Sequence, residues 1–248
     1  MQARTTSGLR GGALLLALLA CGCAGDGSNG PAKLRPAAAD AQANKNDELQ
    51  SLGDDPRTSR GLYSDLIRNM LAQEQYYAAL AHIEQQQGSD GSSDELRFLE
   101  AETRRHLGQV VESDKLYRKL LRSDYAAQSY RGLGLLHAAR NLPAATEFLR
   151  EAVERQPTNA DMRNDLGYAL MSAGRYREAL PEIATAVELD RDSAKARNNL
   201  IILLVLAGDE AGVKRVAEAG GVGTQALSAL RKQARTLSTR IAAKRGVP

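Results

Sequence analysis

Apolar residues recur at helical spacing along most of this chain, and they do so in blocks of about 34 residues. The clearest block covers residues 160–193. Its large apolar positions are Leu166, Leu170 and Ile183, and its small ones are Gly167, Ala179 and Ala186. Small residues let two antiparallel helices approach closely, while larger ones fill the space between successive pairs. The pattern predicts an all-α chain of stacked helical hairpins.

Three earlier blocks carry the same pattern. Residues 127–159 repeat it with one residue fewer in the turn between the helices, and residues 94–126 and 60–93 repeat it more weakly. Ser59 and Ser93 stand where helix N-caps are expected. The period and the placing of the small residues resemble the tetratricopeptide repeat (TPR), which implies a right-handed solenoid.

A fifth, degenerate block covers residues 194–223, followed by a last helix over 224–244. Ile201 and Val213 replace the small residues of the pattern, so we expect the second helix of this block to pack farther from the first. Residues 200–207 are apolar on every side, which predicts that this helix is covered on more than one face. The helix over 224–244 is the expected cap, and the TPR domain is assigned to residues 60–248.

The N-terminal region has the pattern of a secretory signal. Residues 1–20 contain two arginines and then an apolar run that is too short to cross a bilayer. The sequence up to Cys21 resembles a bacterial lipobox, which implies lipidation at Cys21, with Cys23 as the alternative. Residues 21–59 have few large apolar side chains, which predicts a flexible tether. Since no aspartate follows either cysteine, the resemblance implies a lipid anchor on the periplasmic face of the outer membrane.

Composition and charge exclude several classes of function. Without Arg4 and Arg10 of the signal, 31 basic residues stand against 30 acidic ones, so no nucleic-acid footprint remains. The histidines at 82, 106 and 137 fall at different repeat positions, so no metal site is expected. The glycine-rich run 219–224 lacks the lysine of a phosphate loop and indicates a helix break. We therefore expect no enzyme activity, no cofactor and no small-molecule substrate.

The TPR resemblance implies a peptide-binding groove along the first helices of the repeats. The implied groove residues are Arg131, Leu135, Asn164, Tyr168, Met171, Ser172, Lys195, Asn198, Ile202, Val205 and Leu206. The asparagines could bind the backbone of a peptide, or they could bridge neighbouring helices. The apolar strip on the fifth repeat could likewise face a partner or lie under the last helix, and we favour the second for Leu206.

One segment of the sequence extends the resemblance to a particular class of TPR lipoprotein. Residues 197–200 (RNNL) enter the apolar helix, and together with the lipobox, tether and repeats they resemble the TadD-type lipoprotein of tight-adherence (Flp) pili. That resemblance implies a pilotin whose protein partner is a secretin subunit or its terminal segment. The alternatives are an adaptor for envelope proteases or cell-wall hydrolases, a type IV pilus pilotin, and an enzyme with a closed polar pocket.

Overall fold

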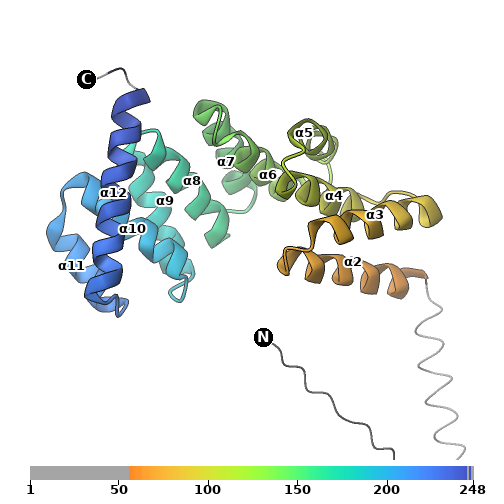
Figure 1. Ribbon diagram of the computed structural model, residues 1–248, viewed down its shortest axis with the longest axis horizontal. Helices are drawn as coiled ribbons and strands as arrows, with labels where there is room; N and C mark the ends of the chain where they lie inside the picture. Colours follow the sequence, from red (N-terminus) through yellow and green to blue (C-terminus); the bar gives the residue numbers. More distant parts are fainter. Residues whose placement is uncertain (1–55, 245, 247–248) are drawn as a thin grey trace, which may run out of the picture. The chain divides into compact units, whose positions relative to one another are not determined.

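The computed structural model describes residues 56–244 and 246, and within them every regular element is an α-helix (Figure 1). The helices are α2 (Pro56–Ala72), α3 (Tyr76–Asp90), α4 (Asp94–His106), α5 (Val110–Lys119), α6 (Ala126–His137), α7 (Leu142–Arg155), α8 (Ala160–Ser172), α9 (Tyr176–Leu189), α10 (Ala194–Ala207), α11 (Glu210–Ala219) and α12 (Thr224–Lys244). The expected signal peptide, Cys21, Cys23 and most of the expected tether lie outside the described residues.

Successive helices pair as the sequence pattern predicts. Helices α2 to α11 form five hairpins, and each hairpin packs against the next. The first helix begins at Pro56, ahead of the predicted start at residue 60, because proline is well accepted in the first turn of a helix. None of the helices in the described part is both long and apolar enough to cross a membrane.

Side-chain caps fix several of the helix starts. The predicted cap at Ser93 is confirmed, since its hydroxyl accepts a hydrogen bond from the Leu96 amide at 3.1 Å. Asn159 and Ser193 cap α8 and α10 in the same way. The predicted cap at Ser59 is wrong, because this residue lies inside α2.

Small residues set the close approach of the paired helices. A Cβ on Gly134 would lie 2.4 Å from Leu149 Cγ, and a Cβ on Gly167 would lie 2.3 Å from Ile183 Cγ1. Both glycines therefore occupy the same place in their hairpins. The predicted register of the third repeat, with its shortened turn, is confirmed by this match.

The fifth hairpin is packed less closely than the third and fourth hairpins. In it, Ile201 and Val213 are buried where small residues are usual. Helix α12 packs on α10, and its Leu230 and Ala234 join the same apolar core as Leu203. The helix over 224–244 therefore covers α10, as its sequence predicts.

Candidate functional site: a cleft between the repeats and the last helix

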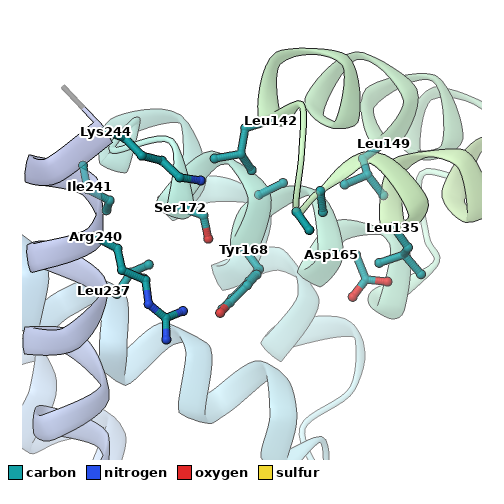
Figure 2. Close-up of a pocket in the computed structure, with 13 residues that line it drawn as sticks. Leu135, Leu142, Leu149, Asp165, Tyr168, Ser172, Leu237, Arg240, Ile241 and Lys244 are labelled. Atoms are coloured by element: carbon teal, nitrogen blue, oxygen red, sulfur yellow. The ribbon is translucent and has the colours of Figure 1, made fainter. Parts of the chain in front are cut away.

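A cleft of about 400 Å³ opens between the third and fourth repeats and the C-terminal half of α12 (Figure 2). Its repeat side carries Leu135, Ala138, Ala139, Leu142, Leu149, Asp165, Tyr168, Ala169 and Ser172, and its α12 side carries Leu237, Arg240, Ile241 and Lys244. Most of these side chains are apolar, and the charged atoms belong to three of them. Such a lining suits a segment that presents an apolar face.

A second hollow of about 520 Å³ continues the cleft along α12. It shares Tyr168, Leu237 and Arg240 with the first hollow, and it adds Asn199, Ile202, Ala229, Lys232, Gln233 and Thr236. Tyr168 is 45% exposed and stands between the two parts. We call the two hollows together the α12 cleft.

The composition of α12 gives the cleft its charge. This helix contains five basic residues and no acidic one. Arg231 pairs with Glu210 at 2.5 Å, outside the cleft. Within the described part of the chain, no ion pair neutralises the three cations that line the cleft, Lys232, Arg240 and Lys244. The α12 side is therefore apolar and positively charged.

The repeat side of the cleft is built over a buried ionic network. The Asp165 carboxylate accepts hydrogen bonds from Arg131 Nε at 2.7 Å and from Lys195 Nζ at 2.8 Å. Its side chain is only 5% exposed. Because these residues come from α6, α8 and α10, one carboxylate joins three repeats. A buried charge of this kind is tolerated only when it is paired.

An amide pair lies beside this network. Asn199 Nδ2 donates to Asn164 Oδ1 at 2.8 Å, which joins α10 to α8, and Asn164 is almost fully buried. The alternative that Asn164 bridges helices is therefore the one that the structure supports. Its position leaves it no surface for a partner.

The structure places the other predicted groove residues in three groups. Leu135, Tyr168, Ser172 and Ile202 line the α12 cleft. Arg131 and Lys195 lie beside it in the ion pairs with Asp165. Asn198, Val205 and Leu206 are half-buried and line neither hollow, and Val205 and Leu206 pack against the main core.

The prediction that Met171 lines the groove is wrong. This side chain is completely buried in the core that α8 shares with its neighbours. Sequence reasoning also missed the contribution of α12, including Leu237, Arg240, Ile241 and Lys244. The available signal was the excess of basic residues, with no acidic one, beside apolar residues at helical spacing on the cap.

A second charged cluster lies in the second repeat, which precedes the repeats that line the cleft. Tyr117 donates to Glu102, and Arg105 Nη2 lies 2.7 Å from the same carboxylate. Burial by itself would raise the pKa of Glu102, but the charge and hydrogen bond of Arg105 and the hydroxyl of Tyr117 outweigh it and lower that pKa. Burial and the Glu102 charge raise the pKa of Tyr117. The cluster holds α4 against α5.

The three histidines occupy separate places. His82 Nδ1 lies 2.8 Å from the Tyr63 hydroxyl, the ring of His106 stacks on Tyr76, and His137 Nε2 lies 2.9 Å from Asp114 Oδ2. No group of three or more histidine, cysteine, aspartate or glutamate side chains in the described residues could hold a metal ion.

Comparison with known proteins agrees with this architecture. Residues 136–201 match the family model described as tetratricopeptide repeat. This part of the chain consists of tetratricopeptide repeats. It is 35% identical over 159 residues to a TPR repeat-containing protein of Pseudomonas aeruginosa, a match that covers 63% of each chain, so it spans less than two thirds of that relative.

Two solved TPR structures have the same fold. A thermophilic TPR protein of Thermus thermophilus has a TM-score of 0.57 and 19% identity, over 72% of this chain and 98% of its own. YrrB, described as a TPR protein with an unusual peptide-binding site, has a TM-score of 0.51 and 19% identity, over 67% of this chain and 89% of its own.

Proposed function

We propose that this TPR protein is a lipid-anchored scaffold of the pilotin type, which binds a secretin segment in the α12 cleft during assembly of a tight-adherence pilus. TPR folds bind protein partners, and YrrB supplies a precedent for peptide binding. The observation that carries the proposal is the cleft itself. It combines apolar side chains from three repeats and α12 with cations of α12 that no ion pair engages within the described residues.

The lining also indicates the chemistry of the bound segment. Leu135, Tyr168 and Leu237 offer an apolar surface, while Arg240 and Lys244 line the α12 side. The charge of Asp165 is already engaged by Arg131 and Lys195. An amphipathic segment with acidic residues beside its apolar face matches this arrangement.

Affinity purification from membranes, followed by mass spectrometry, tests the proposal. We expect the unmodified protein to recover a secretin, and we expect Tyr168→Ala and Arg240→Glu to reduce that recovery by about tenfold or more. The matched control is Arg235→Glu, because Arg235 is exposed on the same helix and lines neither hollow. Equal recovery with Arg235→Glu and Arg240→Glu would remove the cleft from the proposal.

The proposed anchor is tested separately. We expect Cys21→Ala, combined with Cys23→Ala, to leave the protein folded in the periplasm and to release it from the outer membrane. Fractionation gives the answer, and retention of the double variant in the outer membrane would contradict the lipidation proposal. Recovery of a cell-wall hydrolase or an envelope protease in place of a secretin would favour the adaptor function.

A further inference from the structure

A separate cavity of about 540 Å³ lies among α9, α10, α11 and the turn between α9 and α10. Its lining consists of Val187, Glu188, Arg191, Arg197, Leu200, Arg215, Val216, Ala219 and Gly220, and it shares no residue with the α12 cleft. On α10, Arg197 and Leu200 face this cavity, whereas Asn199 and Ile202 face the cleft. At about 100° per residue these two pairs lie on nearly opposite sides of the helix. We call this site the arginine cavity.

The side chain of Arg197 occupies space that a side chain at residue 220 would fill. A Cβ on Gly220 would lie 2.1 Å from Arg197 Cδ and 2.6 Å from Arg197 Nε. The Nε atom of Arg197 is buried, and it has no hydrogen-bond partner in the described part of the chain. A buried N–H group without a partner is uncommon, and this one offers no surface to a ligand, so a ligand would meet Arg197 through the Nη atoms of its guanidinium group.

The charged residues that line the arginine cavity favour an anionic ligand. Arg191, Arg197 and Arg215 line it, and Glu188 is the one acidic side chain in its lining, which leaves an excess of two positive charges. No ion pair within the described residues engages any of the three arginines. Guanidinium groups bind carboxylates through paired, charge-assisted hydrogen bonds.

We propose that the arginine cavity is a second protein-binding site, which takes an acidic peptide segment of a partner. A carboxylate of the segment accepts hydrogen bonds from Arg197 and Arg215. An apolar side chain next to that carboxylate packs on Val187, Leu200 and Val216. A peptide matches this lining better than a phosphate group does, because the atoms next to a phosphate are polar and would leave the apolar wall uncovered.

Fluorescence anisotropy with the full chain and two labelled peptides tests this site. One peptide alternates glutamate with leucine, and the other carries glutamine in place of every glutamate. We expect the glutamate peptide to bind more tightly, with an affinity that falls as salt is added. Arg197→Gln and Arg215→Gln should each weaken that binding by about tenfold or more, since each removes a charged donor.

Matched controls separate binding from folding. Gly220→Ala should displace Arg197 and weaken binding, whereas Gly223→Ala should not, because a Cβ there meets nothing within 4 Å. Lys214→Gln removes one charge next to Arg215 without touching the arginine cavity, so it should keep the affinity. Circular dichroism of every variant checks the helical content, and the exposed Arg215 supplies a test that does not depend on the half-buried Arg197.

Several results would reject the proposed peptide-binding site. Equal affinity for the two peptides, or unchanged affinity in the Arg197→Gln, Arg215→Gln double variant, would reject the site. Binding to phosphatidylglycerol vesicles that depends on Arg197, without binding of the glutamate peptide, would assign the cavity to a lipid phosphate and reject a peptide. Arg240 lines only the α12 cleft. If Arg240→Glu abolished binding of the glutamate peptide while Arg197→Gln and Arg215→Gln did not, the arginine cavity would also be rejected as the binding site.

Discussion

The ring of Tyr117 occupies the space that a side chain on residue 132 would need, since a Cβ on Gly132 would lie 2.3 Å from Tyr117 Cζ. Tyr117 is completely buried, so the ring has no exposed position to move to. We predict that Gly132→Ala lowers the free energy of unfolding by about 1–3 kcal/mol through overpacking. Urea denaturation followed by circular dichroism measures this change.

Gly88→Ala provides the control for that substitution. Gly88 also lies inside a helix, α3, and a Cβ there would meet nothing within 4 Å. We predict a gain of about 0.5–1 kcal/mol, because alanine loses less backbone entropy than glycine when a helix forms. A similar destabilisation by both alanines would show that the fit of Tyr117 against Gly132 is not the cause.

The amide pair between α8 and α10 predicts a difference between two asparagines. Asn164→Ala should cost about 1–3 kcal/mol, because it removes a buried side chain and leaves the half-buried amide of Asn199 without its acceptor. Asn198→Ala should cost less than about 1 kcal/mol, because Asn198 is half-buried and no hydrogen bond of its side chain is present in the described part. Equal costs in thermal unfolding would contradict the bridging role of Asn164.

The low pKa of Glu102 predicts a dependence of stability on pH. A carboxylate whose pKa is lower in the folded state stabilises the protein above its unfolded pKa of about 4.3, and this contribution is lost as pH falls through the folded pKa. We therefore expect the free energy of unfolding to fall between about pH 5 and pH 3.

Glu102→Gln should reduce this acid-dependent loss and should also be less stable at pH 7, because the charge paired with Arg105 is gone. A residual slope should remain, since burial of Asp114 is outweighed by hydrogen bonds from Arg118 and His137 that lower its pKa too. Chemical denaturation at several pH values measures both effects. An unchanged acid slope in the variant would show that Glu102 does not cause it.

Removal of α12 should expose the apolar side of the fifth repeat. We predict that a chain ending at Gly223 binds the dye ANS and forms oligomers, because Ile202 and Leu203 lose the cover that Leu230 and Ala234 give them. A chain ending at Lys244 keeps the whole of α12 and serves as the control. Size-exclusion chromatography in which both chains remain monomeric would contradict the covering role of α12.

The helices and their register could be predicted because the repeat pattern is local. Gly134 and Gly167 mark the same close approach in two hairpins, and their spacing from Leu149 and Ile183 is visible in the sequence. The start of α2 was predicted less accurately than the register of the repeats. Ser59 has the chemistry of a cap, but Pro56 is equally compatible with a helix start, and the pattern alone does not choose between them.

The candidate site depended on contacts between elements that are distant in the chain. Met171 has the repeat position of a groove residue, yet the core shared with the neighbouring helices buries it. Asn164 is buried, and its side chain is hydrogen-bonded to Asn199, which lies 35 residues away in the sequence. The cations of α12 could be read from the sequence, but their place opposite Tyr168 follows from how α12 crosses the repeats.

Helix α12 is at once the cover of the last hairpin and one wall of the cleft, so docking of the helix and occupancy of the cleft are thermodynamically linked. A ligand that requires α12 in place adds its binding free energy to the cost of undocking that helix, about 2.7 kcal/mol at a hundredfold excess over Kd. Amide hydrogens of α10 should then exchange more slowly when the cleft is filled. The rate at which α12 undocks from the last hairpin would therefore show whether a partner is bound in the cleft.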